Sequence, residues 1–256
     1  MSAAEAARSL HHDGQAAVCD LAEPWPHGTI MRASRYPDLL RYNTVRADRG
    51  LPALAAAGLM AFAERELADR PGRRVDIEDE TAARRMRPEF ETAGWLSVLL
   101  VWMRLDERPR ATPASPRVEP VEPEAVRSLR AEWYEEDFPG WDSTRFVDQG
   151  ERLARAAGSR VLAVVDSGAP VGYAQVDPVG DRVEVSQVFV TRSRRGHGIG
   201  GALTQAAVES AEGAREIWIV ADAEGRPREL YGRLGFRPAW VAGQFLRIEQ
   251  GRSAQR

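Results

Sequence analysis

The stretch Val188-Phe-Val-Thr-Arg-Ser-Arg-Arg-Gly-His-Gly-Ile-Gly-Gly-Ala-Leu203 decides the fold of the C-terminal half of the chain. Its apolar beginning predicts a strand, its glycines predict a turn, and the residues that follow have helical spacing. Glycines let backbone N–H groups converge because no Cβ obstructs them, and the helix adds its unpaired N–H groups. With the forked donors of Arg194 and Arg195, the turn is expected to form a cradle for an anionic phosphate group. A flexible turn before a purely structural helix is the alternative interpretation.

Strands and helices alternate on both sides of this stretch. Helical spacing predicts helices over residues 124–135, 144–157 and 226–234, and a further helix from the end of the glycine-rich turn at 196–201 to about residue 211. Apolar runs bounded by turn residues predict strands over residues 117–120, 161–165, 171–176, 182–190, 216–220 and 240–248. This order predicts an α/β (α+β) domain with a mixed central sheet flanked by helices.

A proline-rich segment marks the clearest boundary in the chain. Five prolines fall between Arg108 and Pro123, a composition that favours extended, semi-rigid spacers. We therefore expect an N-terminal unit over residues 1–108, a linker over 109–116, a second domain over 117–250 and a tail over 251–256.

The N-terminal unit repeats part of the pattern of the second domain. It contains expected strands at 41–48, 73–77 and 95–105, and expected helices at 52–69 and 81–92. Phe90, Gly94 and Trp95 have the spacing of Tyr231, Gly235 and Phe236. The pattern suggests two tandem copies of one fold. Coincidence is the alternative, because glycine often follows a helix.

Two segments of the second domain together resemble the Gcn5-related N-acetyltransferase superfamily. Arg195-Gly-His-Gly198-Ile-Gly200 is similar to the family's Gln/Arg-x-x-Gly-x-Gly/Ala motif, and Glu229-Leu-Tyr-Gly-Arg-Leu-Gly-Phe236 resembles its downstream motif. The similarity extends over residues 117–248. It implies an acyl-CoA N-acyltransferase-like fold with a mostly antiparallel sheet. It also implies direct transfer of an acetyl group from acetyl-CoA to a primary amine, without a metal.

The resemblance implies roles for individual residues. The backbone of Val188, Phe189 and Val190 would pair with the pantetheine arm on a strand that splays from its neighbour. The pyrophosphate would be held by Arg194 and by the backbone of Arg195, Gly196, His197, Gly198, Ile199 and Gly200. Tyr231 would be the general acid near the sulfur, and Glu184 the general base, through water. Judged by pattern alone, Tyr231 also fits a core position and Glu184 a solvent-facing one.

Three further features bear on this interpretation. Arg192 stands where the family often has proline, and Glu224 where many members have asparagine. The acidic and aromatic segment 132–142 lies in the connection that commonly lines the acceptor site in this family. Such a surface would suit a cationic amine, whether a small amine or a peptide amine, and inward packing of Trp133 and Phe138 is the alternative. The N-terminal unit has no glycine-rich loop, so we expect it to be a degenerate copy without cofactor binding.

Composition excludes several other classes of function. The chain has 256 residues, 43% of them hydrophobic, with a net charge of −3 and arginine as its only strongly basic residue. No basic field favours nucleic acid, and no apolar run reaches the roughly 18 residues of a membrane span. Cys19 is the only cysteine, which excludes an intrachain disulfide and fits a cytoplasmic location.

The polar N-terminus is expected to be a frayed tail, with a metal contact at His11, His12 and Asp13 as the alternative. The rival interpretation of the whole chain is a catalytically inactive acyl-CoA-binding regulatory protein. Composition does not indicate an oligomeric state.

Overall fold

The computed structural model describes residues 1–109 and 116–248, which form two compact units. Unit 1 comprises Met1–Ala3, Trp102–Ala221 and Gly225–Ala239, and unit 2 comprises Ala4–Val101, Asp222–Glu224 and the chain from Trp240 onward. The units are therefore not the two continuous segments, 1–108 and 117–250, that the sequence suggests. Local patterns locate a strand but not its distant partner. Residues 110–115 of the expected linker and the expected tail at 251–256 lie outside the described residues.

Unit 1 is a sheet with helices on both faces, as the alternating pattern predicts. Its elements are β6 (Glu119–Val121), η3 (Pro123–Val126), α4 (Arg127–Asp137), α5 (Thr144–Ala157), β7 (Arg160–Asp166), β8 (Ala169–Val179), β9 (Arg182–Val190), η4 (Arg192–Arg194), α6 (Ile199–Ser210), β10 (Ile217–Asp222) and α7 (Arg226–Arg233). Strands β6 to β9 pair antiparallel in succession, and β9 pairs with β10 in parallel. Strand β5 (Leu96–Leu105) continues the order beside β10. The mixed, mostly antiparallel sheet is confirmed.

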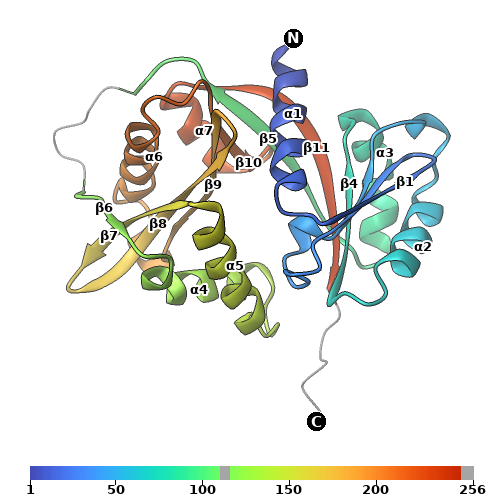
Figure 1. Cartoon of the computed structure of the whole chain (residues 1–256), viewed down its shortest axis with the longest axis horizontal. Coiled ribbons are helices and arrows are strands. Elements are labelled where there is room, and N and C mark those ends of the chain that lie inside the picture. Colours follow the sequence, from blue (N-terminus) through green and yellow to red (C-terminus); the bar gives the residue numbers. More distant parts are fainter. Residues whose placement is uncertain (110–115, 249–256) are drawn as a thin grey trace. The chain divides into compact units, whose positions relative to one another are not determined.

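The two faces of this sheet carry different helices. A Cβ at Gly172 would lie 3.0 Å from the Ile199 side chain, so this face of β8 packs closely against α6. Tyr173, the next residue, points to the other face and packs in a buried cluster with Val126 and Leu129. Val126 lies just before α4, and Leu129 lies in its first turn. Figure 1 shows α6 on one side of β7–β9 and α4 and α5 on the other. Unit 1 therefore has an α6 face and an α4 face.

Unit 2 also consists of β-strands flanked by helices. Its elements are α1 (Ala3–Ala16), β1 (Leu21–Trp25), β2 (Gly28–Arg32), η1 (Leu40–Tyr42), β3 (Thr44–Ala47), η2 (Leu51–Ala53), α2 (Ala56–Glu66), β4 (Gly72–Ile77) and α3 (Glu80–Thr92). Strands β1, β2 and β3 pair antiparallel, and β3 pairs with β4 in parallel. β4 pairs antiparallel with β11 (Phe236–Ile248), the last strand of the described residues.

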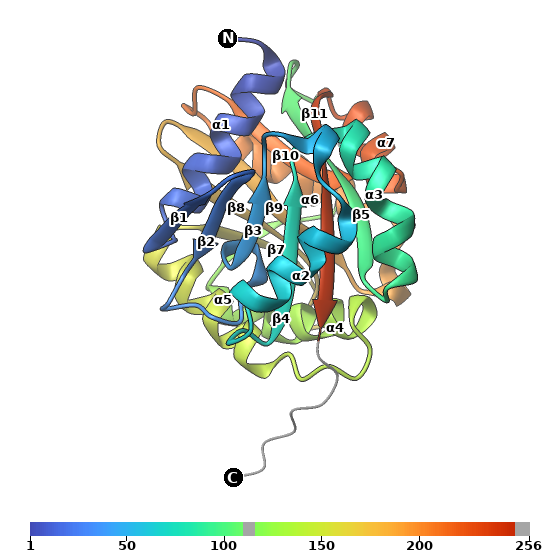
Figure 2. The same ribbon diagram turned by 90° about the vertical axis from the view of Figure 1, so that its right-hand side faces the viewer.

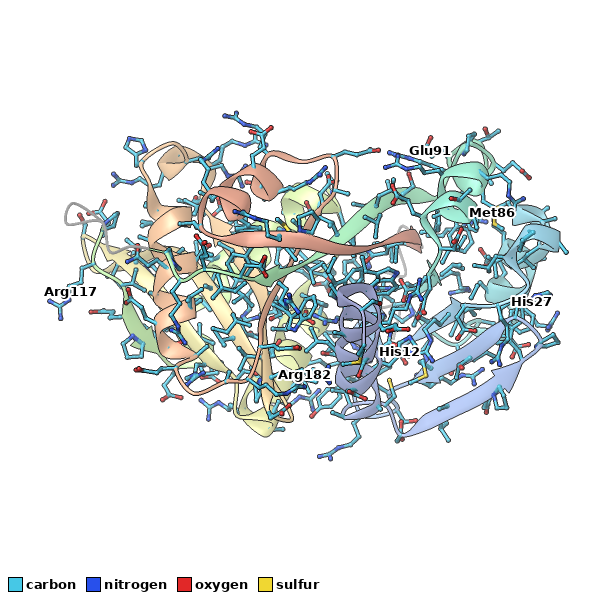
Figure 3. The ribbon with its side chains drawn as sticks, turned by 90° about the horizontal axis from the view of Figure 1, so that it is seen from above. His12, His27, Met86, Glu91, Arg117 and Arg182 are labelled. Carbon is cyan, nitrogen blue, oxygen red and sulfur yellow. The ribbon has the colours of Figure 1, made fainter. Side chains whose placement is uncertain are left out.

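The faces of unit 2 differ in polarity. Val45, Val75 and Ile77 point to one face and are fully buried, and α2 and α3 contact β4 on that side (Figure 2). Met86, from α3, is buried there, whereas Glu91 marks the exposed end of the same helix (Figure 3). Thr44 and Arg46 alternate with the apolar residues of β3 and therefore point to the opposite face.

The polar N-terminus is folded, so the expectation of a frayed tail is wrong. Residues Ala3–Ala16 form α1, whose His11 is 2% exposed. His12 (labelled in Figure 3) contacts the Glu78 carboxylate through Nε2 at 2.5 Å, and Gln15 accepts a hydrogen bond from Arg46. The helix is polar because the face of the sheet that it covers is polar. Composition alone does not reveal that these two polar surfaces pack together.

Burial of His11 predicts a loss of stability in weak acid. In the folded protein the pKa of His11 is held well below 6.5. Burial is the largest cause, and the positive charges of Arg41, Arg74 and Arg46 add to it. Below pH 6.5 the unfolded chain binds a proton that the folded protein does not, so stability falls as pH falls. We expect the free energy of unfolding to drop by up to ~1.4 kcal/mol per pH unit from this group.

Urea unfolding of the wild type and of His11→Leu at pH 7.5 and pH 5.5 checks this prediction. The difference in stability between the two pH values should be smaller in His11→Leu than in the wild type. An unchanged pH dependence in His11→Leu would contradict the assignment.

No helix within residues 1–109 and 116–248 combines the length and the apolar character needed to span a membrane. The same described residues contain no group of three or more His, Cys, Asp or Glu side chains placed to hold a metal ion.

Candidate functional site

The glycine-rich turn connects β9 to α6 and is exposed along residues 192–198. Gly196 and Gly198 have φ values of +83° and +77°, a left-handed conformation that glycine adopts without strain. Gly198 caps α6, whose first backbone bond runs from the Ala202 N–H to the Gly198 carbonyl. Within the described residues, the N–H groups of Gly196 and Gly198 donate no backbone hydrogen bond. The turn therefore presents unpaired N–H groups at the positive end of a 12-residue helix.

Strands β9 and β10 separate beside this turn. Their parallel pairing covers Val183–Val185 against Ile217–Ile219 and ends there, although β9 continues to Val190. On its other edge β9 remains paired with β8 as far as Val190. The side chains of Ser186, Gln187 and Val188 are half-exposed, whereas residues 182–185 are buried. The splayed strand that the family resemblance implies is thus present in unit 1.

A β-bulge lies at the point of separation. Gln175 pairs with Gln187 but Val176 pairs with Val185, so Ser186 has no partner on β8. The extra residue changes which side chains share a face. Glu184 and Gln187 are opposite Asp177 and Gln175, which are two apart on β8, so both point to the α4 face.

The arginines of the turn are held by carboxylates. Arg194 forms an ion pair with Asp166. Arg195 donates through Nε to the Val190 carbonyl at 2.9 Å and pairs with Glu136 of α4 at 2.6 Å, and its guanidinium lies over the Phe189 ring. In this conformation neither arginine extends freely from the turn as an isolated phosphate ligand.

A second link joins α4 to the same turn. Glu132 accepts hydrogen bonds from the Thr191 hydroxyl and from the Arg192 backbone N–H. His197 Nδ1 lies 3.0 Å from the Arg195 carbonyl, which only accepts, so the imidazole donates to the loop backbone. The importance of Glu132 and Glu136 to the turn is not readable from sequence, because their spacing on α4 suggests only an acidic helix.

Tyr231 lies on α7 and is 5% exposed. Its ring contacts Phe236 edge-on at a centroid distance of 6.3 Å, and the neighbouring Leu230 packs against Gly200 at the start of α6. Burial raises the pKa of Tyr231 to about 12. No group in the described parts of the chain forms a hydrogen bond with its hydroxyl. A buried tyrosine whose hydroxyl has no internal partner can hydrogen-bond a ligand.

Glu184 is 2% exposed and lies where β9 is still paired on both edges. It faces Asp177 across β8 and Trp218 across β10. The solvent-facing alternative for Glu184 is therefore wrong. No hydrogen bond joins it to Tyr231 among the described residues, so the expected acid and base are not in direct contact.

The acidic and aromatic segment folds largely on itself. Tyr134 is buried and stacks on Phe146 at a centroid distance of 3.6 Å and on Trp141 at 5.2 Å. Trp133 packs against the apolar core of unit 1. Glu135 accepts from the Gly140 N–H, so this acid also has an internal partner.

The corresponding strands in unit 2 do not separate. Strands β3 and β4 pair from Val45 and Val75 to Ala47 and Ile77, and the Glu78 N–H extends this pairing by donating to Ala47. The connection to α2 contains Gly50 and Pro52, and Pro52 has no N–H to contribute to a cradle. Glu224, which departs from the family pattern, belongs to unit 2 and pairs there with Arg84 and Arg87.

A mixed sheet whose central parallel strands diverge beside a glycine-rich helix start defines unit 1 as an acyltransferase-like domain. Residues 125–236 match the family model described as the acetyltransferase (GNAT) family. The chain therefore contains a GNAT-family domain in its C-terminal half, as the two sequence motifs predict.

Solved structures show the same fold. The GCN5-related N-acetyltransferase from Kribbella flavida covers 96% of this chain and 96% of its own, with a TM-score of 0.59 and 20% identity. A GCN5-related N-acetyltransferase from Sphaerobacter thermophilus covers 88% of this chain and 78% of its own, with a TM-score of 0.54 and 20% identity. A functionally unknown conserved protein from Staphylococcus epidermidis covers 89% of this chain and 93% of its own, with a TM-score of 0.61 and 14% identity. No curated protein matches the chain.

Proposed function

We propose that unit 1 transfers an acetyl group from acetyl-CoA directly to a primary amine. The observation that carries this proposal is the unpaired N–H cradle of the glycine turn, placed beside the separation of β9 from β10 in a GNAT-family domain. The cradle suits the pyrophosphate of a coenzyme A ester because backbone donors and the helix dipole both favour anions. The edge of β9 beyond its pairing with β10 suits the amides of the pantetheine arm as an added strand, once Arg195 releases the Val190 carbonyl.

The chemical step needs few protein groups. The lone pair of a neutral amine attacks the thioester carbonyl carbon, and the C–S bond breaks as the coenzyme leaves as a thiolate. The proton lost by the attacking nitrogen passes to Glu184. Because Glu184 is buried in the part of β9 that is still paired with β10, the proton reaches it through water. Tyr231 donates a hydrogen bond to the departing sulfur.

The internal contacts of segment 132–142 limit how it can interact with an acceptor amine. Its glutamates already have partners in the turn and in the helix end, so they supply a negative field more than free ligands. A cationic amine, small or peptidic, would be drawn to this field and deprotonated before attack.

Titration with acetyl-CoA, followed by an assay of thiol release with a panel of amines, tests the proposal. We expect saturable binding with one cofactor per chain, because unit 2 lacks both the cradle and the strand separation. Amine-dependent thiol release completes the case for an enzyme. Binding without release by any amine would favour the rival regulatory protein, and absence of binding at millimolar cofactor would remove the basis of both.

The Arg195–Glu136 ion pair predicts that removal of an acid tightens cofactor binding. In the free protein Glu136 occupies the guanidinium that an incoming pyrophosphate would attract. Glu136→Gln removes this competitor and one nearby negative charge. We expect the Kd for acetyl-CoA to fall by about 3- to 10-fold at low salt, and by less at high salt.

Glu135→Gln is the matched control, because Glu135 lies on the same helix but contacts the Gly140 N–H instead of the turn. Its Kd should stay at the wild-type value. A weaker affinity in Glu136→Gln would show instead that the ion pair holds the turn in its binding conformation.

A further inference from the structure

Arg130 of α4 is a buried cation that forms no ion pair with a carboxylate of the described residues, although the charge of Glu151 acts on it from farther away. Arg130 is 2% exposed, and among the described residues its guanidinium donates to the side-chain oxygens of Gln175 and Gln187, each at 2.7 Å. The same guanidinium lies 5.1 Å from the ring centroid of Tyr173. Burying a charge is costly unless it is well compensated, so this arrangement suggests a purpose beyond packing.

Arg130 fixes the orientation of the Gln187 carboxamide. A guanidinium only donates, so the oxygen of Gln187 must face it and the Nε2 group must face away. The Tyr173 hydroxyl donates to the same oxygen at 3.0 Å. Burial raises the pKa of Tyr173 above its usual value, which keeps this hydroxyl protonated. The guanidinium, which can only donate, and the Tyr173 hydroxyl thus both donate to the oxygen of Gln187.

The other end of Gln187 has no partner in the described structure. Gln175, in the same chain of hydrogen bonds, donates through Nε2 to Asp177 at 2.8 Å. Gln187 Nε2 donates to no described group, and the side chain is half-exposed. Its neighbour Ser186, the bulge residue, has a buried hydroxyl that also lacks a hydrogen bond. Two polar groups without a partner among the described residues therefore lie where β9 leaves β10, and each can form a hydrogen bond with a ligand or with water.

The Gln187 amide and the cofactor turn belong to opposite faces of the sheet. Gln187 points to the α4 face, as its bond to Arg130 shows. The glycine turn begins α6, which packs on the Gly172 face. If the cofactor approaches from the α6 face and its thioester lies between β9 and β10, the acceptor amine must approach the thioester from the α4 face. Gln187 points to the α4 face.

We infer that Gln187 Nε2 donates a hydrogen bond to an oxygen of the acceptor. The acceptor is then an amine that carries a carbonyl or carboxylate oxygen close to the reacting nitrogen, as amino acids and peptide N-termini do, and not a simple alkylamine. Arg130 and Tyr173 are positioning residues that orient Gln187. This inference rests on the proposed acetyl transfer and names the class of amine that the same site accepts.

Matched acceptors that differ only in a carboxamide test the inference. Glycinamide is compared with methylamine, and phenylalaninamide with phenethylamine, by kcat/KM for thiol release. In the wild type the carboxamide member of each pair should be preferred. Gln187→Met, which keeps length but removes the donors, should lower kcat/KM for the carboxamides at least ~10-fold and leave the simple amines within about twofold.

Two further variants separate recognition from folding. Gln187→Glu keeps an oxygen for Arg130 but replaces the donor with an acceptor, so it should lose the carboxamides while melting near the wild-type temperature. Gln205→Met on α6 removes a glutamine that bonds Glu209, away from the proposed site, and should change neither pair.

The failures of the two proposals are distinguishable. Equal losses for both members of each pair in Gln187→Met, or a wild-type preference for the simple amines, would overturn the assignment while leaving acetyl transfer intact. If the wild type binds acetyl-CoA but no amine of the panel causes thiol release, the proposed function itself is overturned.

Discussion

Replacing Gly198 with valine should raise the Kd for acetyl-CoA at least ~100-fold. Gly198 has a φ of +77°, and a Cβ built there meets nothing within 4 Å in the free protein. The space above it is the space that the proposed pyrophosphate would fill, because the unpaired N–H groups of the turn and of α6 converge there. Valine would obstruct this space and also move the backbone out of the left-handed region. Loss of several charge-assisted hydrogen bonds, each worth ~1.5–3 kcal/mol, accounts for the size of the effect.

Gly213 offers a control matched in conformation and surroundings. It lies beyond the end of α6 with a φ of +91°, and its Cβ would also meet nothing within 4 Å. Gly213→Val should therefore cost a similar amount of stability, ~1–2 kcal/mol, without changing cofactor affinity. Melting temperatures and titrations of both variants check the prediction. Equal affinities in the two variants would show that the turn is structural.

Sequence patterns predicted the part of the fold that depends on local chemistry. The helix over 144–157 and the strand over 182–190 have the bounds expected, because Gly158 stops the helix in a left-handed conformation and a turn at Gly180 precedes the strand. The glycine turn and the separation of β9 from β10 also agree with the family resemblance. These features depend on residues that lie close together in the chain, so short motifs identify them.

Features that depend on distant partners were not predictable. The strands Leu21–Trp25 and Gly28–Arg32 were missed because their apolar residues are too few and Pro24 interrupts the first. The strand at 240–248 was expected in the C-terminal domain, yet its residues belong to unit 2, where Gly243–Ile248 pair with β4.

The side-chain network of the site was hidden for a similar reason. Arg130, Gln175 and Gln187 come from one helix and two strands, and each looks like an ordinary polar residue in sequence. The bulge at Ser186 shifts the alternation of β9, so a regular two-residue pattern would place Gln187 and Glu184 on opposite faces. The recognition chemistry inferred here depends on that irregularity.

Tyr231→Phe should lower kcat by about 10²- to 10⁴-fold while changing the Kd for acetyl-CoA by less than about threefold. The hydroxyl has no internal partner, so its removal should not destabilise the fold, and the phenyl ring preserves the contact with Phe236. Tyr36 is the matched control: it is another buried tyrosine, in unit 2, and Tyr36→Phe should leave kcat unchanged. Unaltered turnover in Tyr231→Phe would assign Tyr231 to the core.

The pKa of Tyr231 determines how it acts on the leaving group. At about 12, this pKa exceeds the ~8.5 of a thiol by about 3.5, so full proton transfer to the thiolate would be uphill by ~5 kcal/mol. Tyr231 therefore stabilises the departing sulfur as a hydrogen-bond donor and remains protonated, which predicts no inflection from this residue in the pH profile of kcat between pH 6 and pH 9. A thioester of an acidic thiol such as thiophenol needs less stabilisation of its leaving group, so the defect of Tyr231→Phe should shrink with that donor. A defect of equal size with both donors would place the role of Tyr231 before C–S cleavage, in positioning the thioester.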